Sequence, residues 1–199
     1  MEIDFKFSSE EKRLLLRIAR ESVEAAVSGR RFTISVPESK RLRQKAGAFV
    51  TLHSRGDLRG CIGLIEGRLP LYETVAEMAE KSAIADPRFN RVTPDEIQDI
   101  DIEISVLSPL KKVGAPEDVA VGTHGVLIEM GFARGLLLPQ VATENGWNRE
   151  EFLRYVCLKA GLGQEDYKDP RAIMYVFTAE VFSEEGLRER SEREIAEGT

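Results

Sequence analysis

The most reactive group that the sequence offers is the thiol of Cys61, which lies in the string LRGCIG at positions 58–63. In an extended strand Arg59, Cys61 and Gly63 point to one face. A neighbouring guanidinium favours the thiolate, which is the nucleophilic form of cysteine. The two flanking glycines indicate a bulge, or a place where another group approaches the backbone. The alternative is structural: Cys61 is a small buried apolar side chain, and the glycines permit close packing.

The register of the hairpin predicted around this string decides whether His53 can act on Cys61. A tight turn pairs Ser54 with Asp57. An unbroken ladder from there places Cys61 opposite Val50, so that His53 points to the other face of the sheet. A one-residue bulge would reverse this and allow a Cys–His pair. The ordinary register therefore leaves the thiol without a base from this strand.

Other acid–base candidates lie further along the chain. Asp99, Asp101 and Glu103 alternate along a predicted strand, which spaces neighbouring carboxylates about 6.5–7 Å apart on one face. They can do acid–base work or form a solvated face, and Glu103 is the best candidate because it lies in mid-strand. His124, in the string GTHG at a strand start, could reach a site from another strand. Alternatively, it is a loop residue with one backbone hydrogen bond.

Nothing in the sequence indicates a bound metal or cofactor. Its 2 His and 2 Cys stand singly, without the spacing of zinc ligands. Neither a P-loop nor a dinucleotide-binding fingerprint is present. Cys157 falls in an apolar helical pattern beside Phe152 and Val156, where core packing is the better interpretation. We therefore expect neither a metal nor a cofactor.

Charge is distributed unevenly along the chain. The net charge is −6, with 34 Asp and Glu against 28 Lys and Arg, yet residues 30–59 hold eight basic and two acidic side chains. A duplex-binding protein would show a dominant basic face, and the acidic remainder argues against binding to nucleic acid. A local anion pocket is predicted if Arg59 and part of a basic cluster converge. Otherwise the cluster is a solvated loop; it comprises Lys40, Arg41, Arg43 and Lys45.

The composition is that of a globular protein in a reducing compartment. Hydrophobic residues make up 42% of the chain and charged residues 31%. No window approaches 18 uncharged apolar residues, so we expect no membrane span. The acidic start lacks the apolar region of a signal peptide. Two cysteines 96 positions apart form no disulfide framework, which favours a cytoplasmic location.

Periodicity predicts an α+β fold with mainly antiparallel sheet. The length of the chain predicts one domain with two lobes. Apolar stripes and caps predict helices at 9–28, 70–84 and 149–160. Alternating or β-branched runs predict strands at 31–36, 47–53, 58–65, 99–107, 124–130, 136–138 and 172–182, with a loop at 109–122. The charged tail 184–199 has two large aliphatic side chains, Leu187 and Ile195. We expect it to be peripheral, docked weakly on the first helix.

Several strings recur in a known order along residues 9–183. Besides LRGCIG they are DPRF at 86–89, IEISVLS at 102–108, HG at 124–125, LLPQVA at 137–142, FL at 152–153 and CLKAGL at 157–162. Together they resemble the AMMECR domain family, and LRGCIG resembles its hallmark motif. Tyr167 is a conservative departure, because many relatives have Trp there.

This resemblance implies an α+β domain with a larger and a smaller lobe and with the hallmark motif at the cleft between them. Arg59, Gly60, Cys61 and Gly63 would then belong to a functional surface. The resemblance also implies a modification pathway, because similar domains occur beside or fused to Memo-type and radical-SAM proteins. It implies no particular reaction.

Two hypotheses about function follow. In the first, the cleft binds a small molecule, expected to be anionic, or a peptide or protein partner. Cys61 is then a contact, and the candidate ligand-binding residues are Arg59, Gly60, Gly63, Glu103, His124, Pro139 and Gln140. In the second, Cys61 is the nucleophile or redox thiol of an enzyme, Arg59 lowers its pKa or binds a substrate anion, and Glu103 or His124 is the acid–base group. The first is favoured because the ordinary register supplies no base to Cys61, and neither involves nucleic acid or a membrane.

Overall fold

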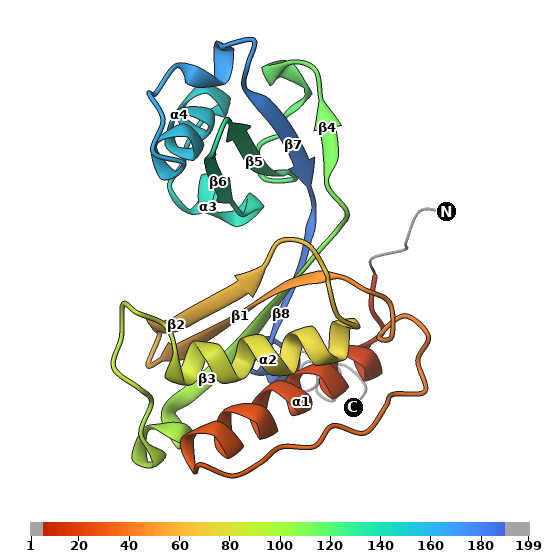
Figure 1. The fold of residues 1–199 in the computed structure, drawn as a ribbon. Helices are drawn as coiled ribbons and strands as arrows, with labels where there is room; N and C mark the ends of the chain where they lie inside the picture. The colour runs from red at the N-terminus through yellow and green to blue at the C-terminus, as the bar shows by residue number, and fades with distance from the viewer. Residues whose placement is uncertain (1–5, 190–199) are drawn as a thin grey trace, which may run out of the picture. The chain divides into compact units, whose positions relative to one another are not determined.

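The structure, a computed structural model, describes residues 6–189, which form two compact units (Figure 1). Among the described residues, unit 1 comprises 6–107 and 180–189, and unit 2 comprises Ser108–Ala179. The chain thus enters unit 2 once and returns once. The two crossings are tied together, because the Ser108 N–H donates to the Thr178 carbonyl (2.9 Å) and the Thr178 N–H donates to Ser108 Oγ (2.9 Å).

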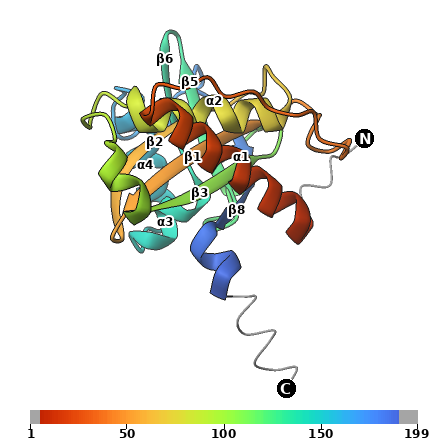
Figure 2. The same ribbon diagram turned by 90° about the horizontal axis from the view of Figure 1, so that it is seen from below.

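Unit 1 is a four-stranded sheet with two helices on one face. Its strands are β1 (Gly47–Ser54), β2 (Asp57–Leu64), β3 (Ile100–Leu107) and β8 (Ala179–Ser183), in the order β2-β1-β3-β8. β1 runs antiparallel to both of its neighbours. Figure 2 shows the helices α1 (Ser9–Val27) and α2 (Leu71–Ile84) lying across these strands. The 3-10 helix η1 (Pro94–Asp99) leads into β3, so that Asp99 lies outside the strand.

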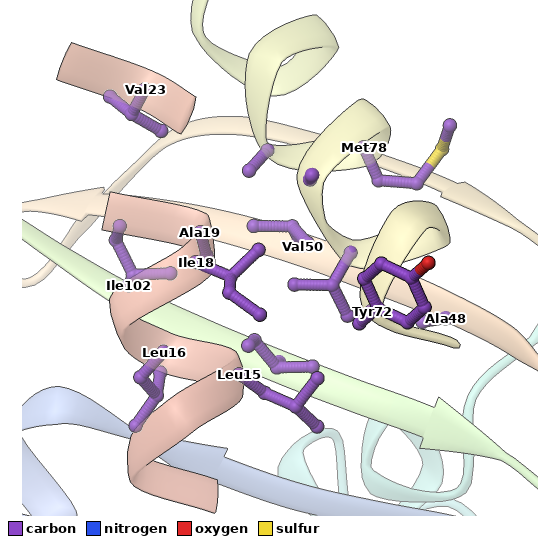
Figure 3. Packing of buried hydrophobic residues seen from close by; sticks show 14 of the residues in the cluster. Leu15, Leu16, Ile18, Ala19, Val23, Ala48, Val50, Tyr72, Met78 and Ile102 are labelled. Carbon is purple, nitrogen blue, oxygen red and sulfur yellow. The ribbon is translucent and has the colours of Figure 1, made fainter. Parts of the chain in front are cut away.

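The core of unit 1 lies between the helices and the sheet (Figure 3). Side chains alternate between the two faces of a strand, and β1 and β3 turn one full set toward the helices. Apart from Ser54 at the end of β1, that set is apolar and buried: Ala48, Val50, Leu52, Ile100, Ile102, Ile104 and Val106. The other set, with Thr51 and Glu103 among its members, therefore forms the helix-free face of the sheet.

Unit 2 is a second four-stranded antiparallel sheet, in the order β4-β7-β5-β6. Its strands are β4 (Lys111–Val113), β5 (Gly125–Met130), β6 (Ala133–Leu137) and β7 (Ile173–Phe177). The helices α3 (Pro139–Glu144) and α4 (Arg149–Lys159) and the 3-10 helices η2 (Pro116–Asp118) and η3 (Asp166–Lys168) complete it. The apolar side of α4, including Phe152, Val156 and the buried Cys157, packs into the core of this unit.

The predicted α+β class with antiparallel sheet is confirmed. The three predicted helices occur as α1, α2 and α4. The capping boxes of α1 and α4 are both formed, by Ser8 with Glu11 and by Asn148 with Glu151. The two predicted hairpins occur as β1–β2 and β5–β6. Local signals therefore placed most of the regular structure.

The strand predicted at 31–36 is wrong, because no described strand pairs with this segment. Its alternate apolar side chains, Phe32 and Ile34, are partly buried against the core of unit 1. The segment lines a groove of about 660 Å³ together with residues of α1 and α2. An alternating pattern buries one side of an extended chain against any apolar surface, and here that surface is helical rather than a sheet edge.

Two predicted segments also differ from the structure, and one helix was not predicted. The strand predicted at 172–182 is two strands, β7 in unit 2 and β8 in unit 1, with a break at Thr178. The predicted loop at 109–122 contains β4 and η2. The sequence analysis missed α3, since six residues are too few to show a helical period. Its start at Pro139, a residue favoured in the first helical turn, was the available signal.

The tail beyond β8 begins as a helix at residues 184–189. The Glu184 carboxylate forms an ion pair with Arg20 of α1 and accepts the Ile102 N–H (3.2 Å). Leu187 packs against the core of unit 1. The remaining part of the predicted tail, with Ile195, lies outside the described residues.

Deletion of residues 186–199 should lower the melting temperature by only a few degrees. Leu187 is partly buried, and burying a whole leucine side chain contributes about 1.5–3 kcal/mol. In a chain of this size about 1 kcal/mol moves the melting temperature by roughly 2–4 °C. Calorimetry of the truncated chain, with full-length Leu187→Ala as a control, measures this. A drop of more than about 10 °C would show that the tail contributes much more than this side chain.

Candidate functional site

The hairpin of β1 and β2 contains a bulge that decides which way Cys61 faces. The pair next to the turn keeps the expected register, but the register shifts between Leu52 and His53. Cys61 consequently lies opposite Thr51 and not, as predicted, opposite Val50. A shift of one residue moves a side chain to the other face of a sheet. Cys61 and His53 therefore share the helix-free face.

Polar side chains of three strands gather around Cys61 on this face. In one row Cys61 pairs with Thr51, and Thr51 pairs with Glu103 on its other side. In the next row His53 pairs with Asp101. The Thr51 hydroxyl donates to Cys61 Sγ at 3.4 Å. All five residues are half-buried, so they form a shallow polar surface rather than a core layer.

Two side chains that follow α2 hold the backbone of Cys61. The Asp86 carboxylate accepts the Cys61 N–H at 2.8 Å, and Arg88 Nη2 donates to the Cys61 carbonyl at 3.1 Å. The two side chains also form an ion pair with an N–O distance of 2.7 Å. An edge strand leaves alternate N–H and carbonyl groups without a strand partner. Here Asp86 and Arg88 satisfy them at the one residue that carries the thiol.

The electrostatics of this pair favour a charged carboxylate although its side chain is only 2% exposed. Hydrogen bonds from Arg88, and another from the Cys61 N–H, hold the pKa of Asp86 far below its usual range despite burial. The pKa of Arg88 is raised, mainly by Asp86 and to a smaller extent by the Cys61 side chain. The guanidinium beside the thiol thus belongs to Arg88, and not to Arg59 as the sequence analysis expected.

Gly60 lets the last turn of α2 approach β2. A Cβ at this position would lie 2.3 Å from the Ser82 carbonyl oxygen, which no rotation of a side chain could relieve. The close approach brings the Ser82 side chain to the sheet. Its hydroxyl accepts the Ile62 N–H (2.9 Å) and donates to the Val50 carbonyl (2.7 Å). Ser82 therefore bridges β1 and β2 beside the bulge.

Gly63 makes room for an aromatic ring on the helix-free face. A Cβ at Gly63 would lie 2.3 Å from ring atoms of Phe49, its partner across the strands. On the other side of Phe49 stands Ser105, which is 1% exposed. Among the described residues its hydroxyl has no hydrogen-bond partner. Buried polar groups without a partner are uncommon and call for an explanation such as a bound water or ligand.

Arg59 is the additional residue of the bulge and is engaged elsewhere. Its guanidinium binds both carboxylate oxygens of Glu96 in η1, at 2.7 and 3.1 Å, and also donates to the Asn90 carbonyl (2.9 Å). The Arg59 hydrogen bonds, followed by the Thr93 N–H, lower the pKa of Glu96 to about 2. These contacts give Arg59 a role in anchoring η1 to the hairpin.

The contacts made by the basic cluster at 38–45 are separate from those of Arg59. Arg41 binds the Lys6 carbonyl and forms an ion pair with Glu11 (3.7 Å), and Arg43 donates to the Glu38 carbonyl (3.3 Å). The pocket for an anion that would combine this cluster with Arg59 is therefore not formed. The interpretation as a loop that makes its own local contacts fits better.

Three of the candidate ligand-binding residues belong to unit 2. His124 Nδ1 accepts the Ala120 N–H (3.1 Å). This is the single hydrogen bond to the backbone that was expected if His124 is a loop residue. Pro139 begins α3 and is buried. The adjacent Gln140 has a buried Oε1 that lacks a partner among the described residues. Cys157 is buried in this unit, and burial raises the pKa of its thiol, in agreement with a packing role.

Neither a metal-ligand cluster nor a membrane-spanning helix is found in residues 6–189. In that range no cluster of three or more His, Cys, Asp or Glu side chains is arranged to hold a metal ion. No helix there is long and apolar enough to cross a membrane.

Comparison with known proteins identifies the relatives of this fold and this site. A family model described as AMMECR1 matches residues 16–182, which include the Cys61 string and both sheets. The chain belongs to the AMMECR1 family. The resemblance inferred from the ordered strings is thereby confirmed.

The relatives that match this chain include archaeal proteins of similar length. A protein of Methanothermobacter thermautotrophicus is 45% identical over 187 residues, which cover 90% of this chain and 97% of that protein. A protein of Methanopyrus kandleri is 41% identical over 189 residues, covering 90% of this chain and 91% of its own. The crystal structure of an uncharacterized protein from Pyrococcus horikoshii matches with a TM-score of 0.86 at 38% identity, over 92% of this chain and 96% of that one.

The residues that hold Cys61 in place were not among the predicted site residues. Asp86 and Arg88 lie in the DPRF string, which was noted as an AMMECR1 feature but was given no role. The available signal was the placement of an acidic and a basic side chain on either side of a proline, just after a helix. No signal in the sequence indicated Thr51 or Ser82, because a lone hydroxyl in a strand or helix has many ordinary explanations.

Replacing Gly60 with alanine should destabilise unit 1 by about 1–3 kcal/mol, the usual cost of overpacking. The added methyl group meets the backbone of Ser82, and the hydroxyl that bridges β1 and β2 must move with it. Urea unfolding followed by fluorescence measures the loss. Gly114→Ala is the matched control, because its Cβ would meet nothing within 4 Å. Equal stability of the two variants would contradict the close approach.

Stability should fall in acid through the pair of Arg59 and Glu96. The pKa of Glu96 is lowered from 4.5 to about 2, so its contribution is complete above pH 4.5 and is lost as the pH falls toward 2. Glu96→Gln should therefore be less stable than the wild type at pH 7 and approach it near pH 2. Urea unfolding between pH 2 and 7 measures this, with Glu21→Gln on the exposed side of α1 as control. A constant difference across that range would contradict the assignment.

Proposed function

We propose that the helix-free face of unit 1, centred on Cys61, binds a small molecule or a peptide segment of a partner protein. The observation that carries this proposal is the fixed presentation of Cys61. Asp86 holds its N–H, Arg88 holds its carbonyl and Thr51 donates to its thiol. Side chains from separate parts of the chain that converge on one half-buried residue are typical of a preorganised site.

The groups around Cys61 define the chemistry of the ligand. The Arg88 side chain is 54% exposed, and among the described residues its Nη1 has no hydrogen bond. It can therefore donate to a carboxylate or phosphate oxygen. The expected ligand is still anionic, but the residue proposed to bind it is Arg88 instead of Arg59. Arg59, Gly60 and Gly63 support this surface through the contacts described above.

The remaining candidates stay part of this proposal. Glu103 lies in the same row as Cys61 and would contact the ligand directly. His124, Pro139 and Gln140 are proposed ligand contacts of unit 2, and the unpartnered Oε1 supports Gln140. We further propose that this AMMECR1 protein acts in the cytoplasm, in a modification pathway with Memo-type and radical-SAM proteins. That context comes from the family resemblance alone.

A second candidate function is cysteine-dependent catalysis with Cys61 as nucleophile or redox thiol. Two observations favour it. The Arg88 guanidinium donates to the Cys61 carbonyl at 3.1 Å, so that a positive charge lies next to the residue that carries the thiol and can bind a substrate anion. The bulge brings His53 onto the same face, and that removes the main objection to a base.

A thermal-shift screen tests the binding proposal. Wild-type protein should be stabilised by members of a set of small carboxylates, phosphates and short acidic peptides, because a ligand that binds the native state raises the melting temperature. Thr51→Val and Cys61→Ala should abolish the shift, whereas Thr123→Val, at an exposed position of unit 2, should keep it. A shift that survives both changes on the helix-free face would place the ligand elsewhere and contradict the proposal.

A further inference from the structure

The bulge brings together three side chains that the unbroken ladder would have separated. Cys61 of β2, His53 of β1 and Asp101 of β3 occupy the same face of three adjacent strands. His53 and Asp101 are direct cross-strand partners, and such partners have Cβ atoms about 4.5–5.5 Å apart. Cys61 is the diagonal neighbour of His53 because its own partner, Thr51, lies two residues away. Diagonal neighbours are about 7–8 Å apart, which long and aromatic side chains can span.

Hydrogen bonding leaves the His53 ring available. Within residues 6–189 no hydrogen bond or ion pair involves this imidazole, although the side chain is half-buried. Neither ring nitrogen is therefore committed to another partner among the described residues. A nitrogen that turns toward Cys61 leaves the other nitrogen directed toward β3, where Asp101 stands.

Within residues 6–189, the hydrogen bonds of Asp101 use only one of its two carboxylate oxygens. Its Oδ1 accepts the Glu185 N–H at 2.9 Å and contacts Arg188 at 3.4 Å. Among the described residues its Oδ2 has no hydrogen bond. The side chain is 22% exposed, and burial, followed by the nearby Glu184 and Glu185, raises the pKa of this carboxyl. A partner that carries a positive charge would relieve this cost.

We infer that His53 is the proton acceptor for the Cys61 thiol and that Asp101 is the residue that positions it. The proton leaves Sγ for one imidazole nitrogen, and the N–H on the other nitrogen donates to Asp101 Oδ2. The products are a thiolate and an imidazolium, so no further reactant is needed. Thr51 donates to the sulfur and Arg88 lies beside it, and both favour the thiolate.

Other charged groups also face this pair and enter the expected pH dependence. Glu103 lies on the same face of β3, next to Asp101. Asp57 pairs with Ser54, so it points to the opposite face of the sheet from His53. Asp86 lies on the backbone side of Cys61, where Arg88 neutralises it. This arrangement deepens the second candidate function and rests on it.

The experiment is the rate of Cys61 alkylation by iodoacetamide between pH 4 and 10. Peptide mass spectrometry separates Cys61 from the buried Cys157. In the wild type the rate should rise with an inflection near or below that of an imidazole, about 6.5, because the thiolate forms as an ion pair. In His53→Asn the inflection should move toward the ordinary thiol value of about 8.5, and the rate at pH 7 should fall at least tenfold. Asp101→Asn should lie between them, and Glu21→Gln, which makes the same change from carboxylate to amide at an exposed position of α1, should match the wild type.

The outcomes separate this inference from the function on which it rests. If the wild type and His53→Asn share an inflection below 7, Arg88 activates the thiol, so that catalysis by Cys61 stands and the role of His53 is overturned. If both react only above about 8.5, the two ideas fail together. A Tyr or Trp fluorescence melt of each variant verifies folding. An NMR titration of the His53 ring in wild type and in Cys61→Ser gives an independent reading, since loss of the thiolate should lower the imidazole pKa, and an unchanged value overturns the pair.

Discussion

The hydrogen bonds between Asp86 and the edge strand β2 determine the geometry on which the rest of this surface depends. A carboxylate that is 2% exposed would be costly without partners. Four donors satisfy it: the Cys61 N–H, the Arg88 N–H, and the Nε and Nη2 of Arg88. Through Nη2, Arg88 returns to the Cys61 carbonyl. The segment after α2 is thereby fixed to β2, and the edge is closed to pairing with another chain.

A second set of contacts, made by α2 and η1, surrounds the bulge. Ser82, near the end of α2, bridges β1 and β2, and Gly60 allows its carbonyl to approach. Arg59 leaves the ladder and binds Glu96. Once one residue is removed from the ladder at this point, every later residue of β2 changes its partner on β1. The face on which Cys61 lies is thus determined by a contact with a helix, and the strands alone do not decide it.

Sequence patterns predicted the elements whose period and caps are local. The burial of Ile100, Ile102 and Ile104 followed from alternation, and α1 followed from its stripe and the Ser8 cap. The chain around Thr178 shows the limit, because one continuous β-forming run serves two different sheets. Residues 31–36 show a second limit, since an alternating pattern does not indicate whether a sheet edge is available for the segment to pair with. In both cases the deciding information lies in distant parts of the chain.

The candidate site was predicted in part for the same reason. The string LRGCIG directed attention to Cys61, but the partners of its backbone come from residues 82–88 and could not be inferred from spacing. The alternative register with a bulge was recognised from general rules, and only the contact with α2 selects it. Arg59 illustrates the converse. A guanidinium two residues from a thiol predicts an interaction with it, yet a carboxylate 37 residues away binds that guanidinium with both oxygens.

Within residues 59–63 the structure accounts for four side-chain positions by packing or pairing. Arg59 binds Glu96, Gly60 admits α2, Ile62 packs against the core of unit 1, and Gly63 admits the Phe49 ring. Cys61 differs, because its backbone is held by the buried Asp86 carboxylate and the half-exposed Arg88 guanidinium, while its thiol faces the polar side of the sheet. A small apolar residue would pack equally well there, since a free cysteine behaves as a small hydrophobic side chain. What distinguishes cysteine at this position is the chemistry of its sulfur, which Thr51 and Arg88 are placed to influence.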